Sequence, residues 1–397
     1  MKVTHVIAGL SMGGAQMMLY KLLSRLDRAA FQSEVISLAD VGPLDKKIRA
    51  LGVPVKVLGM CPGTPNPVAL YRLARWWRND PPQVVQTWMY HADLIGGLAA
   101  KFAGGIPVVW NIRHSHLDVE GNKRSTLWTI RTCARLSRRL PTRIVCCAEL
   151  SRRIHAQLGY AREKMVVIPN GFDLEVFRPD PTARRSVRQE LGIPEEALVI
   201  GLVGRFHPLK DHRNFVEAAA RLHASRPDVH FLLCGDDVTA ENTELAEWIN
   251  AAGLAGRCHL LGPREDVPRL NAALDIACSS SYSEGFPNTI GEAMACGVPC
   301  AVTDVGDSAL IVGDTGSVVP PKNPDALANA WRELIEIGPD GRGLLGAAAR
   351  RRIDQCFSLR AIAARYEDLY AQIAAHGRNR YYRQPVNEQT RAEHVRR

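Results

Sequence analysis

Short apolar segments alternate with longer segments of helical periodicity from one end of this 397-residue chain to the other. The short segments are apolar along their whole length, which is typical of strands buried on both faces of a parallel sheet. This βαβα order predicts an α/β protein in which helices cover both faces of parallel sheets. The expected strands are Val3–Ala8, Ser33–Leu38, Val53–Leu58, Gln83–Thr87, Pro107–Ile112, Arg143–Cys147, Val199–Val203, Val229–Cys234, His259–Leu261, Asp275–Ser279, Pro299–Thr303 and Ser317–Val319.

The pattern restarts near the middle of the chain, after a segment rich in proline and turn residues at 169–181. We therefore expect two doubly wound, Rossmann-like domains, residues 1–172 and 173–358, which face each other across a cleft. A ligand would bind near the carboxyl ends of their strands. Residues 359–376 read as a last amphipathic helix. The basic, apolar-poor tail 377–397 is expected to be disordered.

Bulk composition limits the classes of protein that need to be considered. Hydrophobic residues make up 46% of the chain and charged residues 23%, as in ordinary globular proteins. No apolar segment approaches the roughly 18 residues that a membrane-spanning helix needs. The 10 cysteines include no C-x-x-C pair, which argues against zinc and a disulfide framework. Cys146, Cys147, Cys234 and Cys278 are expected to be core residues. This usage favours a cytoplasmic location.

Positive charge is unevenly distributed within a net charge of +9. The segment 122–140 contains many arginines, no acidic residue and Trp128, while Arg72, Arg75 and Arg78 surround a pair of tryptophans. Basic helices that carry aromatic residues can lie on anionic lipid or meet an acidic acceptor. The same pattern can also be a solvated face with extended arginines. Both interpretations stay open, and we expect no nucleic-acid partner.

The densest cluster of candidate functional residues lies between Ser281 and Cys300. Glu284 occupies a loop rich in glycine and proline, and Glu292 falls on a helix that should begin after Pro287. Unpaired backbone N–H groups at such a helix N-terminus attract a phosphate. Carboxylates beside a phosphate site should face uncharged groups such as sugar hydroxyls. Phosphate and sugar together describe a nucleotide sugar.

Two other loops could contact the same ligand. Arg205 and Lys210 follow the strand that opens the second domain, where they could offset the charge of a departing diphosphate or be solvated loop cations. Gly13 and Gly14 follow the first strand and would allow a phosphate or sugar to approach the backbone, or form only a tight turn. Their spacing is not G-x-G-x-x-G, so a dinucleotide site is poorly supported.

Two histidines end strands at the edge expected to face the cleft. His114 could hydrogen-bond a sugar hydroxyl or stabilise positive charge on a sugar ring, and His91 could meet an acceptor; either could instead cap a loop. No D-x-D triplet occurs to chelate a metal–diphosphate. P-loop and zinc-protease motifs do not occur in the sequence either.

Taken together, these residues resemble the retaining GT-B glycosyltransferases of family 4, and the likeness extends to about Ala375. Glu284 to Glu292 looks like the E-x7-E signature of that family, and Gly204 to Lys210 is similar to its Arg/Lys diphosphate clamp. Gly13-Gly14 looks like its first glycine-rich loop, and His114 matches the histidine that closes its fifth N-terminal strand. Asp304 to Gly316 is similar to a stretch common in members that assemble polysaccharides.

The resemblance implies specific roles for these residues. Glu284 would bind hydroxyls of the transferred sugar and Glu292 those of the ribose, while Arg205 and Lys210 would replace a metal ion at the leaving diphosphate. The base would lie near Leu261 to Arg264, held largely by backbone groups, and the helix from Leu359 would cross back to the first domain. The phosphates would also contact the loop residues Gly285, Phe286, Pro287 and Asn288. One departure is that Gly306 stands alone where the family often has a Gly-Gly pair.

The chain is therefore expected to be a cytoplasmic enzyme, and it would be peripheral to the inner face of a membrane if its basic helices bind lipid. It would transfer a sugar with retention from a nucleotide diphosphate sugar, a UDP-sugar, to a saccharide or lipid-linked saccharide, in polysaccharide or glycoconjugate biosynthesis. No metal or other cofactor would be required. Two alternatives stay open: a nucleotide-sugar epimerase on the same architecture, and a non-catalytic nucleotide-sugar-binding subunit.

Overall fold

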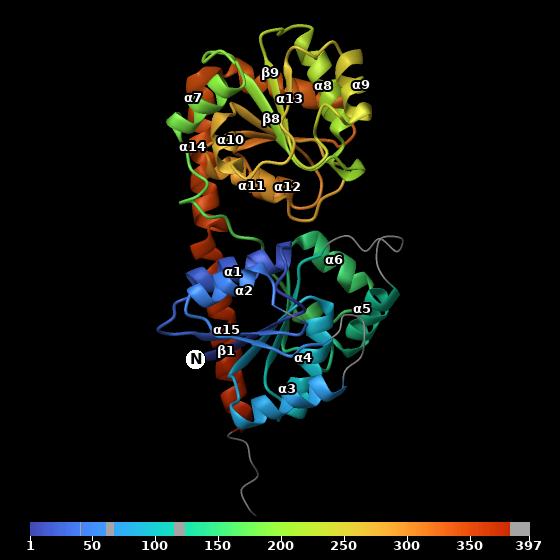
Figure 1. The fold of residues 1–397 in the computed structure, drawn as a ribbon, viewed down its shortest axis with the longest axis vertical. Coiled ribbons are helices and arrows are strands. Elements are labelled where there is room, and N and C mark those ends of the chain that lie inside the picture. Colours follow the sequence, from blue (N-terminus) through green and yellow to red (C-terminus); the bar gives the residue numbers. More distant parts are fainter. Residues whose placement is uncertain (40, 61–66, 115–123, 382–397) are drawn as a thin grey trace, which may run out of the picture.

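The structure is a computed structural model that describes residues 1–39, 41–60, 67–114 and 124–381, with side chains to residue 375. It contains two lobes, each built on one parallel sheet (Figure 1). The predicted strands form with small shifts at their ends. The α/β class and the two doubly wound sheets expected from the sequence are confirmed.

The first lobe contains a seven-stranded sheet of order β3-β2-β1-β4-β5-β6-β7. Neighbouring strands are parallel, as in the pairing of His5 on β1 with Val35 on β2 and Gln86 on β4. The order reverses between β1 and β4. The strands are β1 Lys2–Ile7, β2 Gln32–Ser37, β3 Val55–Val57, β4 Val84–Trp88, β5 Val108–Ile112, β6 Arg143–Cys146 and β7 Met165–Val167.

The second lobe repeats this plan with a six-stranded parallel sheet of order β10-β9-β8-β11-β12-β13. Its order reverses between β8 and β11, where Gly201 pairs with Ala277. Ligands of doubly wound proteins bind at such a reversal, beyond the carboxyl ends of the strands. The strands are β8 Val199–Val203, β9 His230–Cys234, β10 Cys258–Leu260, β11 Ile276–Ser279, β12 Cys300–Thr303 and β13 Gly316–Val319.

Helices cover both faces of each sheet (Figure 1). In the first lobe they are α1 Gly14–Arg25, α2 Pro43–Ala50, α3 Pro67–Asn79, α4 Tyr90–Phe102, α5 Arg124–Leu136 and α6 Glu149–Gln157. In the second lobe they are α7 Pro181–Glu190, α8 His212–His223, α9 Thr243–Ala251, α10 Val267–Ala273, α11 Asn288–Ala295, α12 Ser308–Val312, α13 Pro324–Glu336 and α14 Gly338–Phe357. None of the helices in the described part of the chain is long and apolar enough to span a membrane.

Each sheet has an apolar core on both faces, which explains why its strands are apolar throughout. Val3 and Ile7 of β1 pack on one face, and Val6 packs on the other. The cysteines predicted to be core residues are buried: Cys146, Cys147, Cys234 and Cys278. Aspartates and asparagines set several helix starts; Asp180, for example, accepts hydrogen bonds from the first-turn amides of α7.

Two chain segments connect the lobes and are hydrogen-bonded to each other. The amide of Phe172 donates to Phe357 O, and the amide of Leu359 donates to Phe172 O, both at 2.9 Å. After this crossing, α15 (Leu359–Tyr381) packs against α1 and β4 of the first lobe. Figure 1 shows α14 and α15 along one side of both lobes. The chain therefore passes twice between the lobes.

The last helix is longer than expected. Helix α15 continues to Tyr381, so the predicted end of the helix near residue 376 and the predicted disorder of 377–381 are wrong. Helical propagation adds one backbone hydrogen bond per residue without a new nucleation step, so a helix anchored at Tyr366 and Tyr370 continues beyond its last buried turn. The remainder of the expected tail, 382–397, lies outside the described residues.

Candidate functional site

The reversal of strand order in the second sheet brings two of the sequence-predicted loops together. One follows β8 and carries Lys210, and the other follows β11 and carries Glu284. Lys210 Nζ lies 2.6 Å from Glu284 Oε1, although the residues are 74 positions apart. Ser281 Oγ donates a second hydrogen bond of 2.7 Å to the same oxygen. The carboxylate is thus fixed by a cation and a hydroxyl, and its side chain is only 13% exposed.

Helix α11 begins at Asn288, as the sequence predicted, immediately after the loop that carries Glu284. No side chain caps its first turn. Pro287 before it has an extended backbone and belongs with Phe286 to the buried part of the loop. Amides of an uncapped first turn remain available to an anion. The Gly285–Asn288 segment can therefore contact a phosphate as the resemblance implied.

Glu292 lies one turn further along α11 and is half-buried. Burial raises the pKa of its carboxyl group, and the positive charge of Lys21 on α1 opposes that shift. Since α1 belongs to the first lobe, Glu292 lies where both lobes act on one carboxylate. Its side chain accepts no hydrogen bond from the residues that the structure describes, which leaves both oxygens able to receive hydroxyl donors.

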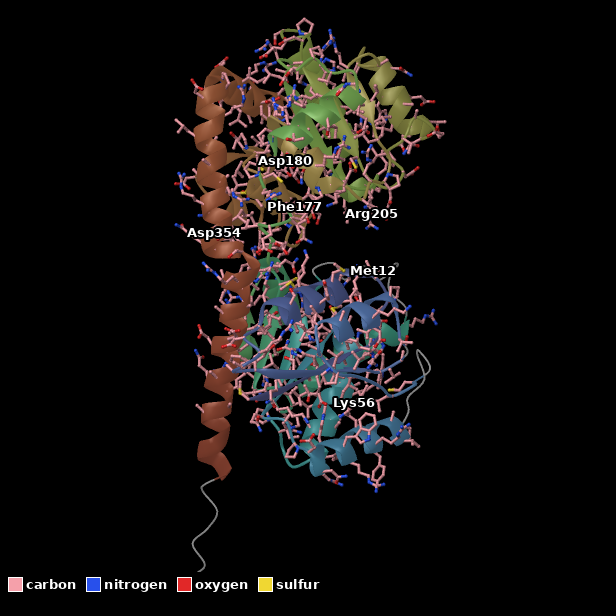
Figure 2. All side chains as sticks on the ribbon, turned by 60° about the vertical axis from the view of Figure 1, so that its left-hand side comes forward. Met12, Lys56, Phe177, Asp180, Arg205 and Asp354 are labelled. Carbon is pink, nitrogen blue, oxygen red and sulfur yellow. The ribbon has the colours of Figure 1, made fainter. Side chains whose placement is uncertain are left out.

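Arg205 lies beyond β8 at the edge of the second lobe that faces the first (Figure 2). Figure 2 places Met12, beside the Gly13-Gly14 turn, on the facing edge of the first lobe. The Arg205 side chain is exposed and forms no ion pair within the described ranges. Its backbone is fixed because the amides of Gly204 and Phe206 donate to Cys234 O at 2.8 Å and Asp236 O at 2.7 Å. The Arg205 guanidinium is therefore available to a ligand among the described residues, while its backbone position is fixed.

The Arg264 side chain is paired with acidic residues. Its guanidinium donates to both oxygens of Asp266, at 2.7 and 2.8 Å, and to Glu190 at 2.8 Å. Arg269 shares both acids. The Arg264 side chain is committed to carboxylates, so only its backbone remains for a base.

Gly13 and Gly14 form the start of α1 on the opposite lobe. Gly13 is the N-cap residue in an extended conformation, and a Cβ there would meet only the flexible end of Gln16, at 2.6 Å. A Cβ on Gly14 would meet nothing within 4 Å. Neither glycine is required by contacts within the described protein. Among the described residues, the space beside Gly14 is open to a ligand, and that beside Gly13 holds only the flexible end of Gln16.

The two histidines follow neighbouring strands of the first sheet. His114 comes after β5, is half-buried, and its carbonyl accepts a 2.9 Å hydrogen bond from Ser151 Oγ on α6. His91 lies in the first turn of α4, after Met89, whose φ is 71°. Burial lowers the pKa of His91, which favours the neutral imidazole. A neutral imidazole can both donate and accept a hydrogen bond.

Asp307 is a buried residue at the boundary between the lobes that the sequence interpretation did not single out. Its carboxylate accepts the amide of Glu149, at 3.0 and 3.2 Å, and so caps α6 of the first lobe. Its own amide donates to Gly285 O at 2.9 Å. Burial raises the pKa of the Asp307 carboxyl group. The only sequence signal was its place after the solitary Gly306.

Gly306 is required by close contact with the loop that carries Glu284. Its φ is 58°, and a Cβ would lie 2.5 Å from both Glu284 O and Gly285 O. The loop after β12 therefore supports the Glu284 loop through backbone contact. Within the described residues, no group of three or more His, Cys, Asp or Glu is placed to hold a metal ion.

Two parallel doubly wound lobes, with charged loops at the strand reversal of the second, define the GT-B class of glycosyltransferases. Two family models match the chain: "Glycosyltransferase Family 4" over residues 12–176 and "Glycosyl transferases group 1" over residues 197–336. EpsF of Bacillus subtilis (strain 168), which is named as a glycosyltransferase, is 30% identical over 314 residues, covering 76% of this chain and 79% of EpsF. The chain belongs to the family 4 glycosyltransferases of GT-B fold.

Other relatives are similar over nearly the full chain. An Escherichia coli enzyme named UDP-Gal:alpha-D-GlcNAc-diphosphoundecaprenol alpha-1,3-galactosyltransferase is 26% identical over 384 residues, covering 94% of this chain and 97% of that protein. The crystal structure of Anabaena HepE in complex with UDP aligns with a TM-score of 0.80 at 24% identity, covering 94% of this chain and all of HepE. The latter likeness supports the fold alone.

Proposed function

We propose that this glycosyltransferase moves a sugar from a UDP-sugar to a saccharide or lipid-linked saccharide with retention of configuration. The observation that carries this proposal is the Lys210–Glu284 pair, placed beside the uncapped first turn of α11, with the exposed Arg205 in the same segment after β8 as Lys210. Sugar hydroxyls would meet Glu284, ribose hydroxyls would meet Glu292, and the diphosphate would meet the α11 amides. This is the division of roles implied by the sequence resemblance.

The chemical step would break the bond between the anomeric carbon and the diphosphate oxygen. Arg205 and Lys210 would offset the negative charge that grows on the departing UDP, so that no metal ion or other cofactor is required. The acceptor oxygen would bond to the anomeric carbon on the same face, and its proton would pass to the leaving phosphate. His114 would stabilise positive charge on the sugar ring. Approach of the two lobes would exclude water.

UDP is the proposed nucleotide because two similar proteins are described with it. HepE has a structure in complex with UDP and another with UDP-glucose, and the Escherichia coli relative is named for transfer from UDP-Gal. The Arg264 side chain is paired with carboxylates. A uracil base near Arg264 would therefore be held by backbone groups.

A lipid-linked acceptor fits the surface of the first lobe. On α5, Trp128 is 63% exposed beside the exposed Arg124, Arg131 and Arg135, and on α3 Tyr71 is 60% exposed beside Arg72. Such helices can bind anionic lipid. The Escherichia coli relative is named for a diphosphoundecaprenol acceptor. We therefore propose peripheral binding at the inner face of a membrane, in polysaccharide or glycoconjugate assembly.

A panel of nucleotide sugars would identify the donor, because a ligand that binds only the folded state raises Tm. The stabilising donor would then be tested for transfer to saccharide and lipid-linked acceptors, with NMR of the product to read the anomeric configuration. Vesicles with and without anionic lipid would test membrane binding, and Trp128→Ala should weaken it.

Several results would contradict this function. Unchanged transfer in both Glu284→Ala and Arg205→Ala would remove the proposed site. Conversion of the UDP-sugar to another UDP-sugar without an acceptor would identify an epimerase. Binding of UDP without turnover on any acceptor extract would indicate a non-catalytic subunit, and an inverted product would refute retention.

A further inference from the structure

A continuous series of polar contacts joins the end of β5 to the first turn of α11. Arg113, the neighbour of His114, contacts Asn170 Oδ1 through Nη2, and Asn170 Nδ2 donates to Asn288 Oδ1 at 2.8 Å. Arg113 Nη1 donates to Ile168 O at 3.3 Å and to Tyr366 Oη at 3.2 Å. The first lobe, the linker and the proposed donor helix are thus connected through side chains.

Both terminal nitrogens of the Arg113 guanidinium take part in these contacts. Tyr366, on α15, also accepts a 2.9 Å hydrogen bond from Asn111 Nδ2 and is completely buried. The planar fork of an arginine can hold several acceptors in one fixed geometry, which a lysine cannot. Arg113 therefore fixes the position of Asn170 relative to the end of β5, to Ile168 and to α15.

The same linker is packed closely against α11. Phe172 stacks on Phe286 with ring centroids 6.0 Å apart, and a Cβ on Gly291 would lie 2.1 Å from the Phe172 ring. Asn170 thus contacts the first turn of α11, and Phe172 contacts its second turn. A displacement of this linker toward α11 must displace the helix as well, because no space remains between Phe172 and Gly291.

We propose that Arg113 and Asn170 are positioning residues that fix the N-terminal turn of α11 for the donor diphosphate. The expected effect on donor binding rests on the proposed function. The positioning of α11 by Arg113 and Asn170 does not depend on it. In this role Arg113, on the first lobe, orients the first-turn amides of α11 on the second lobe through Asn170. Neither residue touches the donor in this role.

Hydrogen exchange in the ligand-free protein tests the positioning step directly. Asn170→Ala and Arg113→Gln should each speed amide exchange within residues 290–296 at least about threefold, because the helix loses its external contact. Arg365→Gln is the matched control: it removes an arginine that donates to Val167 O, at the end of β7 just before this linker, at 2.5 Å but does not reach Asn170. Its exchange in α11 should equal that of the wild type.

Calorimetric titration with UDP tests the consequence. Loss of one hydrogen bond in the series should weaken UDP binding about 3- to 10-fold, and Arg365→Gln should not weaken it. A double-mutant cycle tests the contact itself. The losses of UDP-binding free energy in Asn170→Ala and Asn288→Ala should not add in the double variant, because both substitutions remove the same contact. A purely structural role of Asn170 would give additive losses.

The outcomes separate this inference from the proposed function. If the wild type binds no nucleotide, the proposed function fails and exchange in α11 alone decides the inference. If UDP binds but exchange in α11 or UDP affinity is unchanged in Asn170→Ala, the inference is overturned and the proposed function stands. If Arg113→Gln does not fold, Asn170→Ala, at a half-buried position, still decides the result.

Discussion

Lys210 Nζ contacts Glu284 Oε1 at 2.6 Å, so the cation proposed for the diphosphate is paired with the carboxylate proposed for the sugar. The side chains are 26% and 13% exposed, which means that solvent screens the pair only partly. In the absence of donor each charge partly compensates the other. Donor binding would then require Lys210 to turn from Glu284 to a phosphate, while Ser281 retains its hydrogen bond to the carboxylate.

Replacing Lys210 by methionine should impair transfer more than folding. Lys210→Met removes a cation from the departing diphosphate, and loss of one such contact lowers kcat by about 10²- to 10³-fold. Arg213→Met on α8 is the control, since Arg213 is an exposed cation paired with Glu217 at 3.0 Å. Steady-state kinetics and Tm should be measured together. Equal kcat values for the two variants would contradict the role of Lys210.

Gly306→Ala should disturb the Glu284 loop through the backbone. A Cβ at this position would lie 2.5 Å from two carbonyl oxygens, in addition to the strain of a left-handed conformation. The combined effect should be a loss of about 3 kcal/mol in stability. Gly192→Ala isolates the strain, because Gly192 has a φ of 64° and nothing within 4 Å of a Cβ. Chemical denaturation should show a loss of about 1 kcal/mol in that control.

A lower kcat/KM in Gly306→Ala but not in Gly192→Ala would show that the contact between the two loops supports the donor site. If both glycine variants lost the same stability and the same activity, the contact with Glu284 and Gly285 would have no special importance.

Asp307→Ala should weaken the connection between the lobes. It removes the cap of α6, and loss of an N-cap lowers stability by about 1 kcal/mol. Asp180→Ala removes a cap of α7 entirely within the second lobe and should give a similar loss of stability. Only Asp307→Ala should reduce kcat, because α6 also holds His114 through Ser151. Equal kcat in the two variants would contradict a functional role of Asp307.

Asp93 should make stability depend on pH. Burial raises the pKa of its carboxyl group to about 7, although Thr87 Oγ1 donates a 2.5 Å hydrogen bond to it. The folded state therefore holds this proton more tightly than the unfolded chain. The resulting stabilisation is complete below about pH 4 and is lost as the pH rises to about 7.

Asp93→Asn cannot ionise and should gain stability relative to the wild type over that range, by at most about 1.4 kcal/mol per pH unit. Urea unfolding at about pH 5 and about pH 7.5 measures the difference. Taking the difference between variants cancels opposing contributions from buried histidines such as His155, whose pKa burial lowers to about 4. The exposed Asp340→Asn is the control, and a pH-independent difference for Asp93→Asn would refute the prediction.

Much of the fold could be predicted because its signals are local. Strands such as Val199–Val203 are apolar throughout, and a helix after Pro287 follows from a turn-rich loop before a helical pattern. The end of α15 was missed because a polar, arginine-rich sequence does not reveal that a helix is already nucleated by packing upstream. The pairing of Arg264 with Glu190 could not be predicted, because Glu190 lies on a helix far away in the sequence.

The sequence by itself determined the two parallel sheets, the loops that follow β8 and β11, and the candidate residues Glu284, Glu292, Arg205 and Lys210. Hydrophobic periodicity and turn residues act over a few positions, so these features can be predicted without coordinates. Only the tertiary structure decided that Lys210 pairs with Glu284, that Asp307 caps a helix of the other lobe, and that Arg113 reaches α11 through Asn170. These contacts join residues far apart in the chain, and strand order and the double crossing between lobes bring them together.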